Sequence, residues 1–234
     1  MAKQELALIV GSGPGLSASL ARLFTKEGMQ VALAARDTKK LQSLVKEIDG
    51  WAYPCDASIP KDVERLFDSV TNDTGEPDVV VYNASGRVRG PLTELDVDAV
   101  RNTILVTCYG GFLVGQAAAK RMIKAGHGTI LFTGASASIK GFANSAAFAM
   151  GKMGLSGLVQ SMARELQPQN IHVAQVVIDG GIYDPTKHPE RLTSRGPDGN
   201  LDPDAIAQTY LHLHRQHRSS MCDAQLLRPW VEKF

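Results

Sequence analysis

The stretch LIVGSGPGLSASLARLF, residues 8–24, joins a short apolar run to a segment of helical periodicity through three glycines. Gly11, Gly13 and Gly15 follow the apolar run directly, and the helical pattern begins at the next residue. Glycines permit a tight turn and let backbone N–H groups approach a diphosphate, and the following helix directs its positive dipole end at the same anion. This order predicts a dinucleotide-binding turn. The alternative is a turn with a structural role alone.

Short apolar runs alternate with longer periodic segments along the chain. The apolar runs predict buried strands at 5–11, 30–35, 78–83, 129–134 and 172–178, with a weaker candidate at 51–55. Segments with helical spacing lie between them, at 16–28, 37–49, 60–75, 96–126 and 145–167. Continuous apolar strands that alternate with helices are typical of a parallel sheet covered on both faces. The sequence predicts one α/β domain over 1–234, a doubly wound parallel sheet (Rossmann fold) with helices on both faces.

Composition and charge argue against several classes of protein. The chain has 234 residues, of which 44% are hydrophobic and 21% charged, and its formal net charge is +1. Such a balance gives no electrostatic footprint for nucleic acid or an anionic membrane surface. The apolar runs are too short for a membrane span or a signal peptide. Cys55, Cys108 and Cys222 lie far apart in the sequence. An odd number of scattered cysteines is typical of free thiols in a reducing compartment. We therefore expect a soluble, cytoplasmic protein.

The end of the second predicted strand bears on the choice of cofactor. In dinucleotide-binding folds an acidic residue at this point binds the ribose 2′-hydroxyl of NAD, whereas a basic residue pairs with the 2′-phosphate of NADP. Here Ala35 is followed by Arg36. The sequence thus favours NADP(H) over NAD(H). The alternative is that Arg36 simply begins the solvated helix that follows.

Four motifs resemble those of the short-chain dehydrogenase/reductase family, in the family's order. They are GSGPGLS (11–17), CDAS (55–58), YNASG (82–86) and DGGI (179–182). Each departs from the family pattern or is degenerate by itself, but their order and spacing together resemble the family over nearly the whole chain. Ser17 stands at the last glycine of the first motif, Tyr82 and Ser85 at the first Asn and the Gly of Asn-Asn-Ala-Gly, and Asp179 at the Pro of the Pro-Gly turn.

The resemblance implies an NAD(P)(H)-dependent oxidoreductase and a set of residues that hold the cofactor. In that family the Asp of the second motif contacts the adenine, a role that falls to Asp56 here. The implied cofactor-binding residues are Gly11, Ser12, Gly13, Gly15, Leu16, Arg36, Asp56, Ala57, Asn83, Ala84, Lys152, Gly180 and Ile182.

The family's chemistry depends on a Tyr and a Lys four residues apart on one helix. The lysine holds the nicotinamide ribose and lowers the tyrosine pKa, and the tyrosine passes a proton to or from the substrate oxygen. In AAFAMGK (146–152), Lys152 matches that lysine, but Phe148 stands in the Tyr position and has no proton to give. Without the resemblance, the pair would be a core aromatic beside a lysine whose head reaches water.

The family's Ser and its supporting Asn also have altered counterparts. The Ser position, thirteen residues before Phe148, is Ala135, with Ser136 and Ser138 close by. The Asn position corresponds to Thr107 in the long helical segment. Successive residues of an extended chain point to opposite sides, so Ser136 is not an automatic substitute. In this alignment Lys152 is the one catalytic position that is kept.

Two classes of function follow from these departures. The first is an active oxidoreductase on a carbonyl or alcohol substrate, with the proton supplied by Ser136, Ser138, Tyr183 or water relayed by Lys152. The second is a catalytically impaired NADP(H)-binding protein that acts as a sensor or scaffold. The irregular segment 179–203, rich in Gly, Pro and Asp, has the place of a substrate-covering loop and favours the first.

The last part of the chain suggests assembly and no metal. His212, His214 and His217 lie in YLHLHRQHR (210–218), but helical geometry points the first two about 200° apart, so we expect no metal site. Asp202 and Pro203 are typical of an N-cap and a first helical residue. The tail QLLRPWVEKF predicts a short last strand. The resemblance implies a homodimer or homotetramer that binds a small-molecule substrate.

Overall fold

The computed structural model describes residues 4–184 and 194–232, and the strands in these ranges form one all-parallel sheet. The strands are β1 (Leu6–Val10), β2 (Gln30–Ala35), β3 (Trp51–Pro54), β4 (Val79–Tyr82), β5 (Gly128–Thr133), β6 (Ile171–Ile178) and β7 (Ala224–Leu227). Their order across the sheet is β3-β2-β1-β4-β5-β6-β7. Because the chain reverses its direction of progress between β1 and β4, a crevice is expected beyond the carboxyl ends of these two strands.

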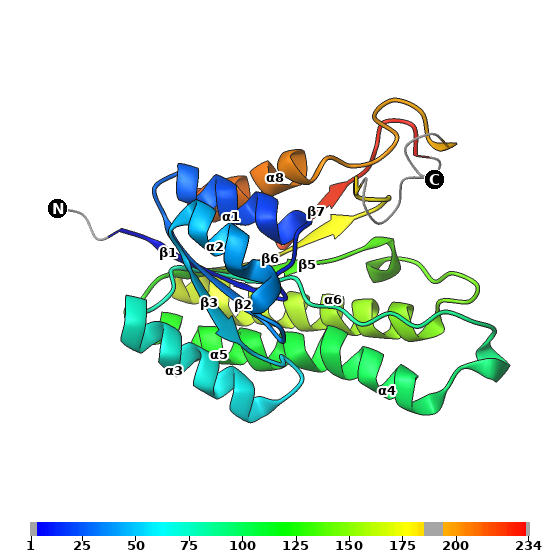
Figure 1. Cartoon of the computed structure of the whole chain (residues 1–234), viewed down its shortest axis with the longest axis horizontal. Coiled ribbons are helices and arrows are strands. Elements are labelled where there is room, and N and C mark those ends of the chain that lie inside the picture. The colour runs from blue at the N-terminus through cyan, green and yellow to red at the C-terminus, as the bar shows by residue number, and fades with distance from the viewer. Residues whose placement is uncertain (1–3, 185–193, 233–234) are drawn as a thin grey trace.

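Helices cover both faces of the sheet, as Figure 1 shows. They are α1 (Leu16–Lys26), α2 (Gln42–Ile48), α3 (Pro60–Thr74), α4 (Val97–Ile104), α5 (Gly110–Ala125), α6 (Ala146–Leu166) and α8 (Pro203–Arg215). Helices α1, α2 and α8 lie on one face, and α3, α5 and α6 lie on the other (Figure 1). The doubly wound α/β fold predicted from the sequence is confirmed, including the weak strand at 51–54 and the short last strand.

Each face of the sheet has its own core because strand residues alternate in direction. In β1, Leu8 packs in a cluster with Phe67 of α3 and Leu155 of α6. Its neighbour Ile9 packs on the opposite side with Phe24 of α1. All five residues of β1 are buried, which is why the strand reads as a continuous apolar run.

The segment 96–126, predicted as one helix, contains a π-helical turn (Leu105–Tyr109) between α4 and α5. A wider turn of this kind disturbs the regular helical bonding of the backbone. Tyr82, buried at the end of β4, donates a hydrogen bond from its hydroxyl to the carbonyl oxygen of Val106 in this turn. A side chain at Gly110 would collide with that hydroxyl. The π turn is therefore fastened directly to the central sheet.

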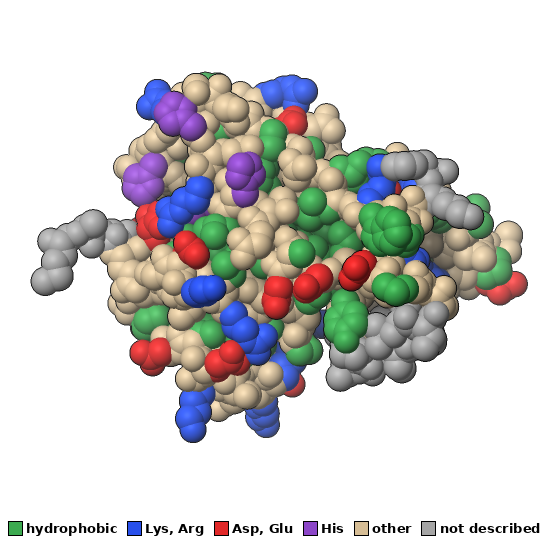
Figure 2. Space-filling model, turned by 90° about the horizontal axis from the view of Figure 1, so that it is seen from above, with side chains coloured by type: hydrophobic (Ala, Val, Ile, Leu, Met, Phe, Trp, Pro, Cys, Tyr) green, Lys and Arg blue, Asp and Glu red, His purple; other side chains and the backbone are tan. Residues whose placement is uncertain are grey.

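The face that carries α1, α2 and α8 mixes charges of both signs with histidines, as the space-filling view in Figure 2 shows. The ion pair between Arg22 of α1 and Glu47 of α2, with 2.6 Å between Nε and Oε1, lies on this layer. Within residues 4–184 and 194–232, none of the helices combines the length and the apolar character that a bilayer crossing requires.

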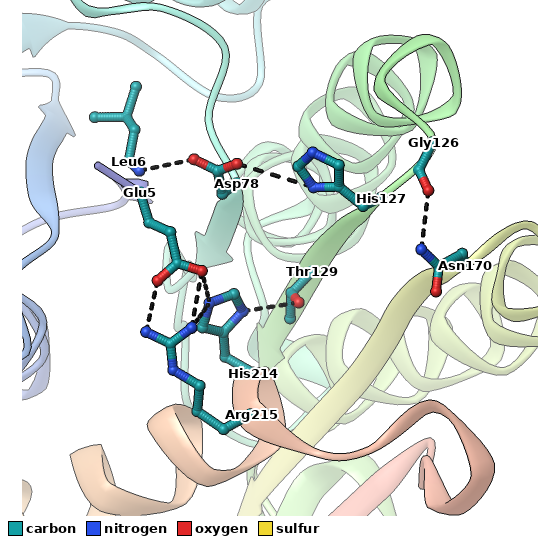
Figure 3. A network of polar contacts seen from close by, with 9 residues as sticks. All are labelled: Glu5, Leu6, Asp78, Gly126, His127, Thr129, Asn170, His214 and Arg215. Carbon is teal, nitrogen blue, oxygen red and sulfur yellow. Dashed lines mark hydrogen bonds and ion pairs between the residues drawn. The ribbon is translucent and has the colours of Figure 1, made fainter. Parts of the chain in front are cut away.

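A polar network fastens the end of α8 to the amino-terminal edge of the sheet (Figure 3). Arg215 binds the Glu5 carboxylate through two hydrogen bonds, of 2.8 and 2.5 Å. His214 bridges Glu5 and Thr129 of β5, with Nε2 3.2 Å from Oε1 and Nδ1 2.9 Å from Oγ1. Asp78 accepts from the Leu6 amide at 2.9 Å. These contacts lie at the opposite edge from the carboxyl ends of the strands.

Candidate active site

The glycine turn after β1 packs against the chain that leaves β4. Gly11 has φ of +87°, a region that other residues rarely adopt, and a Cβ built on it would lie 2.7 Å from the Cβ of Ala84. The amides of Gly11 and Ser12 both donate to the carbonyl oxygen of Ala34 in β2, at 3.0 and 2.9 Å. The turn is thus held between β2 and β4, where only glycine fits at position 11.

Ser17, which departs from the glycine of the resembled motif, has a visible structural role. Its hydroxyl lies 3.3 Å from the carbonyl oxygen of Gly11 and accepts from the side-chain amide of Asn83 at 2.7 Å. The backbone N–H of Asn83 donates to the carbonyl oxygen of Val10 at 2.8 Å. Ser17 therefore connects the glycine turn at the start of α1 with the loop that follows β4.

A cavity of about 430 Å³ opens at this edge of the sheet, and we call it the central cavity. The predicted residues that line it are Gly11, Gly13, Gly15, Leu16, Asn83, Phe148, Lys152, Gly180 and Ile182. A Cβ built on Gly13 or Gly15 meets no atom within 4 Å, so the space beside the turn is open. Open space next to the amides of a helix start is what a diphosphate group needs. These residues therefore fit a dinucleotide cofactor.

A second cavity, of about 240 Å³, lies on the β2 side of the glycine turn, and we call it the side cavity. It brings together the predicted residues Gly11, Ser12, Arg36, Asp56, Ala57, Asn83 and Ala84. Burial works to raise the pKa of Asp56, but hydrogen bonds from Ser58 and the charge of Arg36 outweigh it and hold that pKa below its ordinary value. Lys40, which the sequence did not single out, lines the same cavity.

Helix α6 presents Phe148 and Lys152 to the central cavity. Lys152 is 3% exposed, its ammonium donates to the carbonyl oxygen of Thr133 at 2.7 Å, and it lies 5.9 Å from the centre of the Phe148 ring. Burial lowers the pKa of Lys152 to about 8, because the charged form loses its hydration. The sequence prediction that these two residues share one helical face at the site agrees with this geometry.

Thr107 lies in the π turn and is fully buried. Its hydroxyl accepts from the Gly86 amide at 2.9 Å and lies 3.4 Å from the Gly86 carbonyl oxygen. A Cβ on Gly151 would be 2.9 Å from the Thr107 Cβ, so the Thr107 side chain packs directly against the backbone of α6. Thr107 therefore positions the loop after β4 against α6, and it is not among the lining residues of these cavities.

The two serine candidates near the end of β5 face different ways. Ser138 is buried, and its hydroxyl accepts from the amide of Ala135 at 3.1 Å and from Gln175 at 3.4 Å. Ser136 forms a hydrogen bond with the buried carboxylate of Asp179 and lines a third cavity. The structure thus turns Ser138 into the interior, contrary to its predicted place at the site, and leaves Ser136 beside the cavity.

The third cavity, of about 590 Å³, adjoins the central cavity, and we call it the outer cavity. Both are lined by Arg87, Ala135, Phe148, Ile178, Gly180 and Gly181. The guanidinium carbon of Arg87 lies 4.7 Å from the centre of the Phe148 ring. Sequence reasoning missed Arg87, although a basic residue four positions after Asn83, in the loop that leaves a parallel strand, was a usable signal.

The irregular segment predicted at 179–203 lies partly at this site, and its part 185–193 is outside the described residues. A Cβ on Gly180 would be 2.7 Å from the Pro229 Cδ, which explains a glycine there. Ile182 pairs with Leu201, and Tyr183 lines the central cavity. Among the described residues no group of three or more His, Cys, Asp or Glu is placed to hold a metal ion.

Comparisons with known proteins agree with this geometry. Residues 5–193 match the model of the short chain dehydrogenase family. A "short chain aldehyde dehydrogenase 1" of Euphorbia lathyris is 31% identical over 72% of this chain, and the match spans 61% of that protein. The chain thus aligns with less than two thirds of that relative's length.

Solved structures give the same assignment over nearly the full length. A short-chain dehydrogenase from Rhodopseudomonas palustris superposes with a TM-score of 0.84 at 31% identity, covering 97% of this chain and 99% of that one. A metagenomic short-chain oxidoreductase, solved in complex with NADP, has a TM-score of 0.83 at 28% identity, with coverage of 97% and 98%. The chain belongs to the short-chain dehydrogenase/reductase family of NAD(P)-dependent oxidoreductases.

Proposed function

We propose that this protein is an NADP(H)-preferring oxidoreductase that interconverts a carbonyl group and an alcohol in a small-molecule substrate. The observation that carries the proposal is that one cavity is lined both by the glycine turn and by the buried ammonium of Lys152. The turn has open space for a diphosphate. Lys152 lines the same cavity, which supports a contact with the nicotinamide ribose. Family membership supports the same class of reaction.

The preference for NADP(H) rests on the side cavity. Arg36 and Lys40 line it together with Asp56 and Ala57. Two cations beside the predicted adenosine position favour a ribose 2′-phosphate over a hydroxyl. The related metagenomic oxidoreductase was solved with NADP, which supports this choice.

The chain's own groups supply the protonic part of the reaction. The reduced cofactor, when bound, supplies a hydride to the carbonyl carbon. The carbonyl oxygen then needs a proton, and Phe148, which we place in the family's tyrosine position, has none to give. We assign the proton to the Lys152 ammonium, acting directly or through a water molecule, because it lines the central cavity and its pKa is lowered to about 8. Ser136, held by Asp179 beside the outer cavity, is the second candidate.

The variant Phe148→Tyr tests this assignment. A phenol placed four residues before Lys152 restores a dedicated proton donor, so carbonyl reduction with NADPH should accelerate by about 10²- to 10⁴-fold. The matched control is Phe112→Tyr, which adds a hydroxyl at an exposed position of α5 outside the three cavities and should leave the rate unchanged. NADPH oxidation is measured against a panel of ketones and aldehydes. An equal rate in wild type and Phe148→Tyr would refute the placement of Phe148.

A second function is favoured by Phe148 itself. A site that binds NADP(H) but has a phenyl ring where a donor is expected suits a sensor or scaffold that does not turn over. Both functions predict that NADPH raises the melting temperature of the protein. One set of results separates the two functions. If the wild-type protein binds NADPH but oxidises it with none of the carbonyls tested, and only the variant Phe148→Tyr is active, the protein is a sensor or scaffold.

A further inference from the structure

A buried carboxylate lies where the central and outer cavities meet. Asp179 lines the outer cavity and is 3% exposed. Its chain neighbours Ile178 and Gly180 line both cavities, so Asp179 stands beside the passage from one cavity to the other. The outer cavity is not lined by the glycine turn, and a dinucleotide that runs from the turn to Lys152 occupies the central cavity. Burial of a charge is costly, and the cofactor does not account for it here.

The end of β7 fixes the place and the charge of this carboxylate. The backbone N–H of Asp179 donates to the carbonyl oxygen of Leu227 at 2.8 Å, and its Oδ2 accepts from Arg228 Nε at 2.6 Å. Burial works to raise the pKa of Asp179. The hydrogen bonds from Arg228 and Ser136 and the charge of Lys140 outweigh burial and hold that pKa below its ordinary value. Asp179 is therefore an ionised group that accepts hydrogen bonds and donates none.

Lys140 brings hydrogen-bond donors to the same wall of the outer cavity. Its backbone N–H donates to the carbonyl oxygen of Ser136 at 3.1 Å, in the short turn after β5, and both residues line the cavity. The Lys140 ammonium lies 3.9 Å from Asp179 Oδ2 and 5.6 Å from the centre of the Phe142 ring. A separation of 3.9 Å is too long for a direct hydrogen bond. The contact therefore uses neither the N–H groups of Lys140 nor a lone pair of Asp179.

The spacing of this pair matches one kind of ligand group. A carboxylate accepts about four hydrogen bonds, and the side chains of Arg228 and Ser136 give Asp179 two of them. An oxygen atom about 2.8 Å from both Asp179 Oδ2 and Lys140 Nζ would bridge the two groups. That oxygen must donate to Asp179 and accept from Lys140. A hydroxyl does both, whereas a carboxylate has no proton to donate and an ammonium has no lone pair to accept.

We propose that Asp179 and Lys140 bind a hydroxyl group of the carbonyl substrate, so that the protein interconverts small hydroxyketones or hydroxyaldehydes and the corresponding diols. This inference rests on the proposed oxidoreductase function and adds the substrate class to it. The bound hydroxyl is unchanged by the reaction, in which the cofactor and a proton reduce the carbonyl alone. Because Ile178 and Gly180 on either side of Asp179 also line the central cavity, the hydroxyl lies within a few bonds of the reacting carbon.

The test compares hydroxyketones with ketones of the same size. The probes are hydroxyacetone, 4-hydroxy-2-butanone and α-hydroxyacetophenone, and their counterparts, with a methyl group in place of the hydroxyl, are 2-butanone, 2-pentanone and propiophenone. Dissociation constants are measured by calorimetry on the NADP⁺-loaded protein, and KM and kcat are measured by NADPH oxidation. At least one hydroxyketone should bind about tenfold or more tightly than its methyl counterpart. A hydroxyl also activates a neighbouring carbonyl, so binding and KM decide the test, and kcat does not.

Variants assign the effect to the two side chains. Lys140→Met removes the donors but keeps the length of a side chain that is 42% exposed, so the fold should be kept. It should weaken binding of the hydroxyketone by about tenfold, mainly through KM, without weakening its methyl counterpart. Lys140→Arg, which restores donors, should recover part of the loss.

Asp179→Asn keeps the shape of the acceptor but removes its charge, and it should reduce the same preference. Its melting temperature shows whether the protein is folded, and if it is not, the two Lys140 variants decide. The matched control is Lys120→Met. Lys120 is an exposed lysine of α5 that donates to Gln116 at 3.2 Å and lies outside the three cavities, so its loss should change none of these values.

The outcomes keep the two proposals apart. If every hydroxyketone binds no more tightly than its methyl counterpart, or if Lys140→Met binds it as wild type does, the hydroxyl site is overturned. If the methyl ketones nevertheless drive NADPH oxidation, the oxidoreductase function stands without that site. If hydroxyketones bind through Asp179 and Lys140 but NADPH is not oxidised, the hydroxyl site stands and the oxidoreductase function falls.

Discussion

Lys152 is a cation with little water around it, and this sets its chemistry. It is 3% exposed and its ammonium donates to the carbonyl oxygen of Thr133. A neutral carbonyl dipole offsets only part of the lost hydration, so the proton leaves more easily than from an ordinary lysine. A buried lysine with a pKa of about 8 can both hold a proton at neutral pH and release it to an alkoxide.

The pH dependence of the reaction follows from this value. Because the ammonium form gives the proton, kcat/KM for carbonyl reduction should be constant at low pH and fall as pH rises through about 8. The measurement is a pH profile of NADPH oxidation by wild type and Lys152→Met. The variant should be slower by about 10²-fold or more and should lack the step. A wild-type profile that stays flat to pH 10 would exclude Lys152 as the proton source.

Two glycines of the turn should respond differently to the same substitution. Gly11→Ala places a Cβ against Ala84 at a φ of +87°, so the free energy of unfolding should fall by about 2 to 4 kcal/mol. Gly13→Ala has open space around it and should change that free energy by less than about 0.5 kcal/mol. Gly13→Ala should instead weaken the binding of NADPH, because the added methyl group enters the space that the diphosphate would occupy. Urea unfolding and NADPH titration separate the two, and matching stability losses would contradict this assignment.

At the scale of elements, α8 is held at both of its ends. Asp202 caps its start by accepting from the Asp204 amide at 2.8 Å, and Pro203 is its first residue, as the sequence predicted. Its last turn carries His214, whose side chain is 8% exposed. A neutral imidazole protonated on Nε2 donates to Glu5 and accepts from the hydroxyl of Thr129, so it satisfies both contacts (Figure 3).

The contacts of His214 with Glu5 and Thr129 predict a loss of stability in mild acid. Burial lowers the pKa of His214 below its ordinary 6.5, so the unfolded chain takes up the proton first as pH falls. Stability that is present above pH 6.5 is therefore lost below it. The hydrogen bond from Arg215 lowers the pKa of Glu5 below 4.5, which adds a further loss below that pH. Urea unfolding from pH 8 to 4 should show the first step in wild type.

The control variants lie on the same helix. His214→Gln keeps hydrogen-bonding groups but cannot titrate, so its free energy of unfolding should not decline near pH 6.5. His212→Gln, at an exposed position of α8, should keep the wild-type decline. If the free energy of unfolding has the same pH dependence in wild type and His214→Gln, the titration of His214 does not cause the loss of stability.

At the scale of the whole molecule, the layers could be predicted from the sequence, but the directions of site side chains could not. Continuous apolar runs indicate strands buried on both faces, and their alternation with helices fixes a parallel sheet. The inward turn of Ser138 depends on Gln175, thirty-seven residues away, and Arg87 depends on the Phe148 ring. Such contacts join segments distant in sequence, and no local periodicity encodes them.

The expected homodimer or homotetramer stays a prediction. Large apolar side chains are exposed on one layer, at Tyr109 and Phe112 around the start of α5 and at Met150 and Met153 of α6. Tyr109 and Phe112 stack with 6.1 Å between ring centres. Exposed apolar side chains on neighbouring helices are the kind of surface that a second copy covers.

The ion pairs that fasten the end of the chain have a practical consequence for protein engineering. Arg228 holds Asp179 at the end of β6, and Glu232 lines the outer cavity while it binds Arg195. Strand β1 begins on the side of the molecule away from this region (Figure 1). An affinity tag or a fusion partner is therefore better joined ahead of β1, because one joined after Glu232 would start beside the outer cavity and could lower activity by crowding it.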